Sequence, residues 1–401
     1  MIGLKEIHQA QARLAPYLFR TPLERSSELD ERGISLYSKL ETLQRTGSFK
    51  IRGALNKILS LSETERKRGV IAASMGNHAQ GVALAAKLAG IPATVVMPIG
   101  APLVKLENTR GYGATVLEVG QTFEESLDHA LRLAGQKNLT FIQAFDDPDV
   151  IAGQGTIGLE ILEQLPDLNE VVVPVGGGGL IAGVATAIKE TKPGAIVTGV
   201  QASGANAAVL SLKQGRLVSI ERASTFADGI RVKQPGELCL RIIQNRVDRM
   251  VEVDDDQIAS AVLALMDRSK AVVEGAAATT LAAVQKGLAG EKKTVLILSG
   301  GNIDFTQISR ILSRGLAQMG RLARIRVLLP DVPGTLAALL STIKEEGANV
   351  LEIEHDRTFY SGPVNSTQVL VTLETKGSAH IEKILKKIEG IGYHPERLNH
   401  A

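Results

Sequence analysis

The stretch VVVPVGGGGLIAGVATAI, residues 171–188, decides the fold of this 401-residue chain. It holds no charged residue and is long enough for a membrane span, but Pro174 and four consecutive glycines would break a spanning helix. A buried strand, a glycine loop and a helix are therefore predicted. In the loop Gly176–Gly179 several backbone N–H groups can converge at the positive end of the helix dipole, which predicts a phosphate-binding site.

The same loop also fits a dinucleotide-binding pattern, because Gly177, Gly179 and Ala182 satisfy G-x-G-x-x-A. A dinucleotide fold places an acidic residue near the end of the following strand, where it binds the ribose hydroxyls. Here that strand ends at Gln201, and the loop lacks the Lys-Ser/Thr ending of a nucleotide P-loop. A monophosphate is favoured, and an NAD-dependent dehydrogenase is the more remote alternative.

Short apolar strands alternate with amphipathic helices from Leu36 to about Ser299. This alternation predicts parallel sheets with helices on both faces, and the strands are too many for one modest sheet. We therefore expect an α/β fold of two doubly wound domains, with a ligand-binding cleft at the carboxyl ends of the strands. The predicted strands are 70–74, 93–97, 115–119, 141–144, 171–175, 196–201 and 294–298.

The pattern changes after Met319. From Arg321 onward it reads strand, helix, strand, strand, helix and strand, which is the order of a small ferredoxin-like module. We expect a catalytic domain at 1–318, with a small subdomain at about 49–147 inserted in it, and a C-terminal module at 322–401.

Composition and charge argue against several classes of function. The 45 Lys and Arg nearly balance the 43 Asp and Glu, and a net charge of +2 argues against nucleic-acid and anionic-membrane partners. The single cysteine, Cys239, permits no disulfide within the chain, which suits a cytoplasmic protein. The seven histidines show no metal-ligand spacing, so no metal site is predicted.

One lysine, Lys50, stands out in the segment TGSFK at 46–50. Ser48 is interpreted as a helix N-cap, because Ile51, Leu55 and Ile58 follow at helical spacing. The ammonium of Lys50 would then lie in the first helical turn, where the helix dipole lowers its pKa. A partly neutral amine is what a Schiff base with an aldehyde cofactor requires. Taken alone, Lys50 would be read as a solvated surface lysine.

Two further junctions follow predicted strands. SMGNHAQG at 74–81 opens a helix whose free N–H groups suit a carboxylate, and Asn77 offers an amide to a phenolic oxygen. We interpret His78 as a positioning group and not as a metal ligand. In SGGN at 299–302 the hydroxyl of Ser299 suits a neutral heteroaromatic nitrogen, although a simple turn is the commoner use of Gly-Gly.

Together these segments resemble those of fold-type II (tryptophan synthase β-like) pyridoxal phosphate enzymes, and among them the branch of threonine ammonia-lyase (threonine dehydratase) and serine racemase. The resemblance is carried by SFKIRGA at 48–54, SMGNHAQG at 74–81, the glycine loop, and LSGGN at 298–302. The tail, with DVPGTL at 331–336 and GANV at 347–350, resembles an ACT domain, a module that commonly binds free amino acids.

The resemblance implies a role for each matching residue. Lys50 would bind the cofactor aldehyde, Asn77 the ring hydroxyl and Ser299 the pyridine nitrogen, while Glu274 lies near the cofactor or caps a helix. Lys50 and Ser74 are the expected catalytic residues. The residues implied to hold pyridoxal 5'-phosphate are Phe49, Lys50, Asn77, Gly176, Gly177, Gly178, Gly179 and Ser299. Those implied to bind the substrate are Ser74, Met75, Gly76, Asn77, His78 and Gly229. Those expected at an effector site are Asp331, Gly334 and Asn349.

Two positions depart from the family pattern. Relatives in the racemase branch carry a second serine where this chain has Met75, which cannot donate a proton to the far face of a carbanion, so elimination should dominate over racemisation. Many relatives bind a divalent cation through a glutamate where this chain has Gln201, followed by Ala205 and Ala207. A shell so poor in carboxylates predicts no Mg²⁺ or Mn²⁺ requirement, and leaves a monovalent cation near Gln201 open.

The expected activity is therefore β-elimination of L-threonine, and of L-serine, to 2-oxobutanoate or pyruvate and ammonia. The C-terminal module would bind an amino-acid effector, isoleucine or valine first, and the family expectation is a homotetramer or homodimer. The alternatives are a serine racemase, a hydroxyaspartate dehydratase, or a non-catalytic amino-acid sensor.

Overall fold

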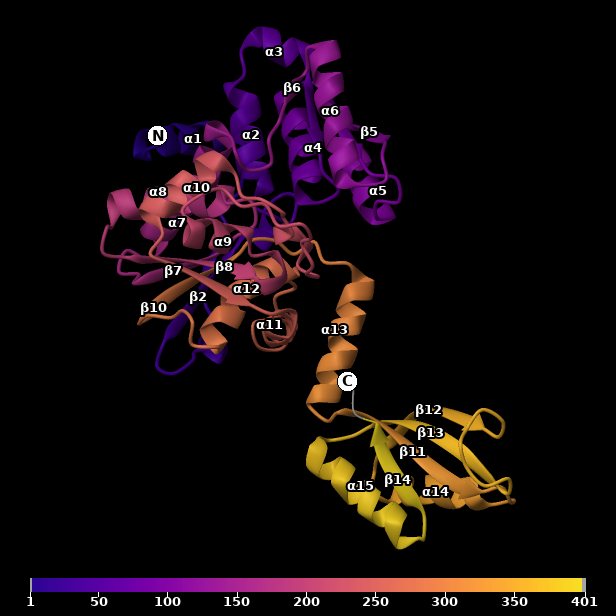
Figure 1. Cartoon of the computed structure of the whole chain (residues 1–401). Helices are drawn as coiled ribbons and strands as arrows, with labels where there is room; N and C mark the ends of the chain where they lie inside the picture. Colours follow the sequence, from indigo (N-terminus) through magenta and orange to yellow (C-terminus); the bar gives the residue numbers. More distant parts are fainter. Residues whose placement is uncertain (1, 399–401) are drawn as a thin grey trace. The chain divides into compact units, whose positions relative to one another are not determined.

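The computed structural model describes residues 2–398, in two compact units, Met1–Ile303 and Asp304–Ala401 (Figure 1). The outer ends of the expected domains, at Met1 and at 399–401, lie outside the described residues. Helix α13 (Phe305–Gln318) falls in the second unit, so the structure divides the chain before this helix; a boundary near residue 318 stays a proposal. Among residues 2–398, no helix combines the length and the apolar character needed to cross a membrane.

The larger sheet of the first unit has six strands, and we call it and its helices the large lobe. In spatial order the strands are β1 (Leu23–Arg25), β2 (Ser35–Leu40), β10 (Lys293–Leu298), β7 (Glu170–Pro174), β8 (Ile196–Ala202) and β9 (Arg249–Val253). All neighbours pair in parallel except β1 with β2. The carboxyl ends of β7 and β10 therefore open at the same edge of the sheet.

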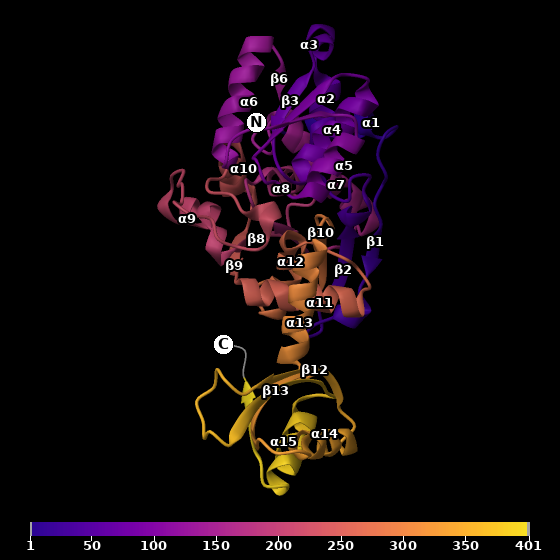
Figure 2. The ribbon, with the colours of Figure 1, turned by 90° about the vertical axis from the view of Figure 1, so that its right-hand side faces the viewer.

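Helices cover both faces of this sheet (Figure 2). Val171, Val173 and Val295 pack against α7 (Pro148–Gln164) and α8 (Gly179–Thr191) on one face. On the other face α12 (Gly275–Gln285) contacts the central strands. The remaining helices of the lobe are α1 (Leu4–Leu14), α9 (Ala207–Gln214), α10 (Glu237–Arg246), α11 (Asp255–Arg268) and the short turns η1 (Ser27–Leu29), η2 (Glu41–Leu43), η3 (Ser203–Ala205) and η4 (Asp228–Ile230).

The smaller sheet, with its helices the small lobe, has four parallel strands. Their order is β5 (Thr115–Glu118), β4 (Ala93–Met97), β3 (Val70–Ala73) and β6 (Thr140–Phe141). The helices of the lobe are α2 (Lys50–Ser60), α3 (Glu63–Arg68), α4 (Asn77–Ala89), α5 (Leu103–Gly111) and α6 (Phe123–Lys137).

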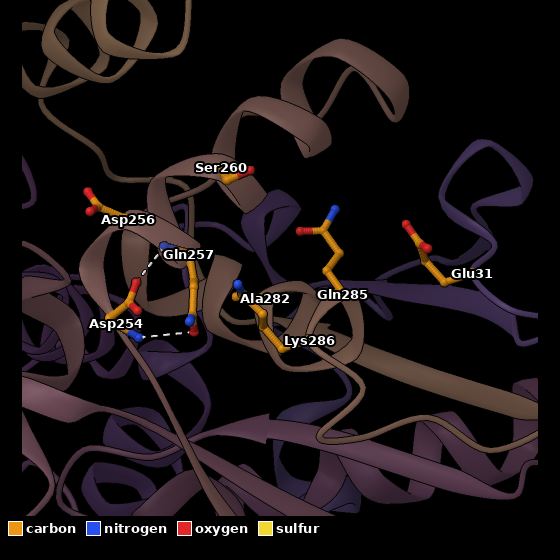
Figure 3. A pocket seen from close by; sticks show the side chains of 8 residues that line it. All are labelled: Glu31, Asp254, Asp256, Gln257, Ser260, Ala282, Gln285 and Lys286. Atoms are coloured by element: carbon orange, nitrogen blue, oxygen red, sulfur yellow. Dashed lines mark hydrogen bonds between the residues drawn. The ribbon is translucent and has the colours of Figure 1, made fainter. Parts of the chain in front are cut away.

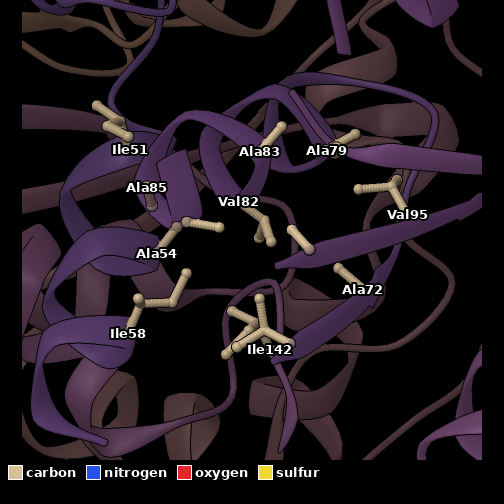
Figure 4. Close-up of a cluster of buried hydrophobic side chains, with 14 of the residues drawn as sticks. Ile51, Ala54, Ile58, Ala72, Ala79, Val82, Ala83, Ala85, Val95 and Ile142 are labelled. Atoms are coloured by element: carbon tan, nitrogen blue, oxygen red, sulfur yellow. The ribbon is translucent and has the colours of Figure 1, made fainter. Parts of the chain in front are cut away.

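Alternate residues of β3 face opposite sides of the small sheet, as the two-residue period of a strand requires. Val70 and Ala72 belong to the core under α2 and α4, drawn in Figure 4, whereas Ile71 and Ala73 pack with α6. Fully burying a side chain the size of Val70 stabilises the fold by about 1.5–3 kcal/mol. The prediction of an α/β fold with two doubly wound sheets is confirmed.

The second unit carries an antiparallel sheet in the order β12 (Asn349–Asp356), β13 (Ser366–Glu374), β11 (Leu322–Pro330) and β14 (His394–Leu398). Helices α14 (Thr335–Glu345) and α15 (Ser378–Gly390) complete the predicted strand-helix-strand-strand-helix-strand order, so the ferredoxin-like prediction is confirmed. Its core includes Ile325, Val371 and Ile384.

Glycines let helix α7 lie unusually close to its two neighbours. A Cβ atom on Gly153 would lie 2.6 Å from the carbonyl oxygen of Arg52 in α2, and one on Gly183 in α8 would lie 2.3 Å from the carbonyl oxygen of Ile151 in α7. No side chain fits at these crossings, so α2, α7 and α8 pack backbone against backbone.

Candidate active site

The predicted site segments meet where strands β3, β7 and β10 end, beside the start of α2. The backbone N–H of Phe49 donates to the carbonyl of Ser299 (3.0 Å), and that of Gly301 donates to Gly47 (2.9 Å). Ser48 pairs with Gly300 as an isolated β-bridge. These bonds join two segments about 250 residues apart in sequence, and they place the first residue of α2, Lys50, next to Ser299.

The prediction that Ser48 caps α2 is wrong. Phe49 occupies the N-cap position, and no side chain makes a capping bond there. The hydroxyl of Ser48 is buried and has no hydrogen-bond partner among the described residues. The backbone of Ser48 pairs with Gly300 instead, and its buried hydroxyl is available to another molecule.

Lys50 is half-buried, and its Nζ donates to the carbonyl oxygen of Ala144 at 3.0 Å. Burial disfavours the charged form and lowers the pKa of Lys50 to about 8, while the negative charge of Glu274 acts in the opposite direction. The predicted lowering of the pKa is confirmed, but desolvation is its main cause and not the helix dipole.

The low pKa of Lys50 gives a testable pH dependence. Only the neutral amine attacks an aldehyde, and in the folded chain Lys50 is protonated below about pH 8. The rate at which the apo chain takes up pyridoxal phosphate should rise with pH through about 8 and then level off, followed by absorbance from about pH 6 to pH 10. An ordinary lysine has a pKa of about 10.4, so its rate of cofactor uptake would still climb steeply above pH 9. Such a climb would contradict the lowered pKa of Lys50.

Asn77, Glu274 and Asn302 form a hydrogen-bonded row beside Lys50. The Nδ2 of Asn77 donates to both carboxylate oxygens of Glu274 (3.0 and 2.8 Å), and the Nδ2 of Asn302 donates to Oδ1 of Asn77 (2.8 Å). Burial, and then the charge of Asp228, raises the pKa of Glu274 to about 7. Glu274 occupies the N-cap position of α12, as the helix-cap alternative expected, but its carboxylate makes no capping bond there.

The glycine loop lies too close to its neighbours to hold side chains. A Cβ atom on Gly177 would lie 2.4 Å from the ring of Phe145, and one on Gly178, where φ is +98°, would lie 2.8 Å from Cys239. Within residues 2–398 no protein acceptor is recorded for the N–H groups of Gly176–Gly179. Gly178 is the N-cap of helix α8 and Gly179 its first residue, so free N–H groups lie at the positive end of the helix dipole, where an anion is favoured. These free donors, the free hydroxyl of Ser48 and the half-buried amine of Lys50 fit pyridoxal phosphate.

Sequence comparison points to the same cofactor. Residues 14–300 match the family described as pyridoxal-phosphate dependent enzymes. The chain belongs to the pyridoxal-phosphate dependent enzyme family. The G-x-G-x-x-A pattern in the loop therefore does not indicate a dinucleotide here.

Residues 323–390 of this pyridoxal-phosphate dependent enzyme match the ACT domain family. An L-threonine ammonia-lyase of Thermotoga maritima is 49% identical over 395 residues, which cover 98% of each chain. A solved structure of a T.th. threonine deaminase is 44% identical, with a TM-score of 0.72 over 76% of this chain and 99% of that one. A maize serine racemase structure is 35% identical, with a TM-score of 0.74 over 79% and 98%.

The helix start at Ser74–His78 presents its backbone to the site. No recorded hydrogen bond within the described chain uses the N–H groups of Asn77 and His78, which open α4. The hydroxyl of Ser74 accepts from the N–H of Gly76 (3.2 Å), and Met75 packs against the core of the small lobe. The free N–H groups suit the substrate carboxylate of this enzyme.

The ring of His78 is already engaged elsewhere. It is buried, its Nε2 lies 2.9 Å from the carbonyl oxygen of Ile142, and burial followed by the nearby charge of Lys50 lowers its pKa to about 3. A neutral imidazole that donates to a carbonyl braces the helix start, so any contact of His78 with substrate rests on its backbone N–H.

A buried charge cluster lies behind Lys50 and was not predicted. The guanidinium of Arg52 bonds both carboxylate oxygens of Glu41 (2.8 and 2.8 Å) and of Glu160 (2.6 and 3.1 Å). Lys39 donates to Glu160 at 2.6 Å, which leaves the cluster with two cations and two anions. Its side chains come from β2, η2, α2 and α7, so it ties the helix that carries Lys50 to the large lobe. A sign of this buried cluster was present in the sequence, because Arg52 lies within the SFKIRGA motif.

Gln201 uses its side chain to join neighbouring backbone segments. Its Nε2 donates to the carbonyls of Val175 (3.3 Å) and Ala205 (3.1 Å), and its Oε1 accepts from the N–H of Val209 (2.9 Å). Among the described residues, no group of three or more His, Cys, Asp or Glu side chains is placed to hold a metal ion. The amide thus satisfies the carbonyls that a cation at this position would coordinate.

The expected effector residues are not brought together within one unit. Asp331 and Gly334 follow the end of β11, where Asp331 accepts two bonds from Nε of Arg357 (3.1 and 3.0 Å). Asn349 begins β12 beside Glu374, at the opposite end of the sheet. Nine residues of β11 separate the two ends, a distance of about 27 Å.

A separate hollow of about 410 Å³ lies on the large lobe (Figure 3). Asp254 and Gln257, two of its residues, cap the start of α11. None of the site residues predicted from sequence is among those that line it, which are Glu31, Asp254, Asp256, Gln257, Ser260, Ala282, Gln285 and Lys286.

Proposed function

We propose that the enzyme is a threonine ammonia-lyase that converts L-threonine to 2-oxobutanoate and ammonia, and L-serine to pyruvate and ammonia. One observation carries the choice of elimination. Lys50 offers an amine with a pKa of about 8. The position after Ser74 holds Met75, whose partly buried side chain packs against the core and cannot carry a proton.

The chain's residues divide the work as follows. The free N–H groups at the start of α4 bind the substrate carboxylate, and those of Gly176–Gly179 bind a phosphate. Pyridoxal phosphate, when bound, supplies the conjugated ring that delocalises the electron pair left when the α-proton departs. Lys50 accepts that proton, because at neutral to mildly basic pH its amine can exist in either form. Ser299 presents a hydroxyl to the ring nitrogen, which does not force a proton onto it as a carboxylate would.

The overall reaction balances without an oxidant or reductant. The α-proton and the β-hydroxyl leave the substrate as water. A second water then replaces the nitrogen, which departs as ammonia, and leaves a 2-oxo acid. A racemase would instead need a second proton donor on the far face, the place of Met75.

A substrate panel tests the proposal. L-threonine, L-serine, D-serine and 3-hydroxyaspartate are incubated with the reconstituted enzyme, and the 2-oxo acid and the chirality of the remaining amino acid are measured. We expect 2-oxobutanoate from L-threonine as the fastest product. Accumulation of D-serine from L-serine would instead identify a serine racemase, and oxaloacetate release would identify a hydroxyaspartate dehydratase.

The enzyme should be insensitive to chelators. Because the amide of Gln201 already bonds the carbonyls of Val175 and Ala205, we expect unchanged 2-oxo-acid release after dialysis against EDTA. Loss of activity that Mg²⁺ or Mn²⁺ restores would contradict this expectation.

Regulation is proposed to act through the ACT domain, with isoleucine or valine as the first effectors to test. The assembly is proposed to be a homotetramer or homodimer, and the location the cytoplasm. Product release is measured with and without each amino acid, and the mass of the assembly by light scattering. An enzyme whose rate does not respond to amino acids would remove the regulatory proposal and leave the catalytic one intact.

A further inference from the structure

Residues 215–236, which we call the strap, connect α9 to α10 without regular structure apart from the turn η4. Connections longer than about 12–15 residues without secondary structure are uncommon in compact domains and usually functional. This strap includes Gly229, the substrate-loop residue expected from sequence.

One side of the strap is fixed to the large lobe. The carboxylate of Asp255, at the start of α11, accepts from the hydroxyl of Thr225 and from the N–H of Phe226. At the far end, the N–H of Gly236 donates to the carbonyl of Gly177 (2.9 Å) in the glycine loop. The strap is therefore fixed to the large lobe at Thr225–Phe226 and at Gly236. The segment between these two anchors, residues 227–235, is what we call the middle of the strap.

The middle of the strap is paired with the small lobe. Lys105 of α5 lies 2.5 Å from the carboxylate of Asp228, and Glu124 of α6 lies 2.6 Å from the ammonium of Lys233. The small lobe contributes the cation to one pair and the anion to the other. A strap shifted along the small lobe would lose both pairs, which favours one position of the strap. The Lys105 pair has side chains 16% and 37% exposed, against 50% and 54% for the Glu124 pair. The more buried pair is screened less and should dominate.

The Lys105–Asp228 pair is adjacent to the reacting groups. Gly229 follows Asp228, and a Cβ atom on Gly229 would lie 3.1 Å from Oε1 of Glu274. Glu274 in turn accepts both bonds from Asn77. The position of the strap therefore determines the space beside Glu274 and, through it, beside Asn77.

We propose that Lys105 is a positioning residue of the reaction: through its ion pair with Asp228 it holds the strap against the small lobe, so that Gly229 stays packed on Glu274 at the substrate side of the site. The kinetic part of this inference rests on the proposed function. The structural part does not, because it concerns only the register of the strap.

Hydrogen–deuterium exchange of the holoenzyme without substrate tests the structural part. In Lys105→Gln, peptides covering residues 225–233 should exchange at least about fivefold faster than in the parent enzyme, because the strap opens more often. The matched control is Lys189→Gln. Lys189 pairs with Asp248 at 2.7 Å, with side chains 17% and 39% exposed, remote in sequence from the strap. This control should leave exchange at 225–233 unchanged.

Steady-state kinetics on the preferred amino acid of the panel tests the functional part. Lys105→Gln should raise KM by about tenfold, the scale of one charge-assisted hydrogen bond, and lower kcat less. Lys105→Arg keeps the charge and should retain most of kcat/KM. The exchanged pair Lys105→Asp with Asp228→Lys should recover part of what each single change loses.

The outcomes separate the two claims. Unchanged exchange at 225–233 in Lys105→Gln, or equal exchange in Lys189→Gln, overturns the proposal whatever reaction the enzyme catalyses. Faster exchange with unaltered KM and kcat also overturns it, because the strap would then be irrelevant to the reaction. A failure of the exchanged pair to recover either readout overturns the pairing with Asp228. Failure of the proposed function itself would appear earlier, as a panel without 2-oxo-acid release.

Discussion

Lys50→Ala will lower the rate of 2-oxo-acid release by at least about 10³-fold, because a methyl group can neither bond the cofactor aldehyde nor accept the α-proton. The half-buried amine, with a pKa of about 8, is the group that we propose for both tasks. The measurement is steady-state product release by the cofactor-supplemented variant. Borohydride reduction followed by peptide mass spectrometry supplies the second readout, with an adduct on Lys50 in the parent enzyme and none in the variant.

Lys50→Arg is the matched control for charge. Arginine keeps a cation near Glu274 but cannot be deprotonated at any working pH, so it should be as inactive as the alanine variant. Lys87→Ala, on an exposed position of α4, controls for the loss of a lysine elsewhere and should keep the parent rate. Substantial activity in Lys50→Arg would show that a neutral amine at this position is not required.

Arg52→Met will have the largest effect on stability, lowering the free energy of unfolding by about 3–5 kcal/mol. Arg52 is 2% exposed and bonds two buried carboxylates, Glu41 and Glu160. Its removal leaves both anions without their main partner, while Glu160 keeps Lys39. Methionine approximates the length of the side chain, so the expected loss comes mainly from charge and not from a cavity. Calorimetry of the apo chain would record it as a lower Tm.

Two comparisons make the Arg52 result interpretable. Arg52→Lys keeps the charge but not the two-pronged hydrogen bonding, and should fall between the parent and Arg52→Met. Arg20→Met removes an exposed pair with Glu163, whose side chains are 55% and 49% exposed, and should change stability by less than about 1 kcal/mol. A Tm for Arg52→Met equal to that of Arg20→Met would show that the buried cluster contributes little.

Local chemistry is what the sequence could predict. The run Val171–Val175 is apolar, and the glycines after it have a use that depends only on their own backbone, so strand, loop and helix were all read correctly. Strand β2 was missed because its burial depends on residues far away in the sequence. It contains Lys39, a charged residue that is fully buried only because Thr21, Glu160 and Gln164 from distant segments accept its hydrogen bonds.

Long-range contacts explain the errors at the site. Ser48 has the sequence signature of a helix cap, but Gly300 pairs with its backbone and overrides the local preference. The role of Glu274 stayed open in the sequence because its partner comes from a distant segment. Asn77 bonds Glu274, and Asn302, from a third segment, bonds Asn77. The expected effector residues failed to meet because the antiparallel sheet sends Asp331 and Asn349 to opposite ends.

Where helices α2, α7 and α8 cross backbone against backbone, their spacing is fixed. The first residue of α2 carries the amine, and the loop Gly176–Gly179, which we propose binds the phosphate, leads into α8. No side chain separates the three helices at Gly153 or at Gly183, so main-chain contacts fix the distance from the amine to the glycine loop. A cofactor longer or shorter than a pyridoxal ring with its phosphate arm would not span this fixed distance, whatever side chains surround it.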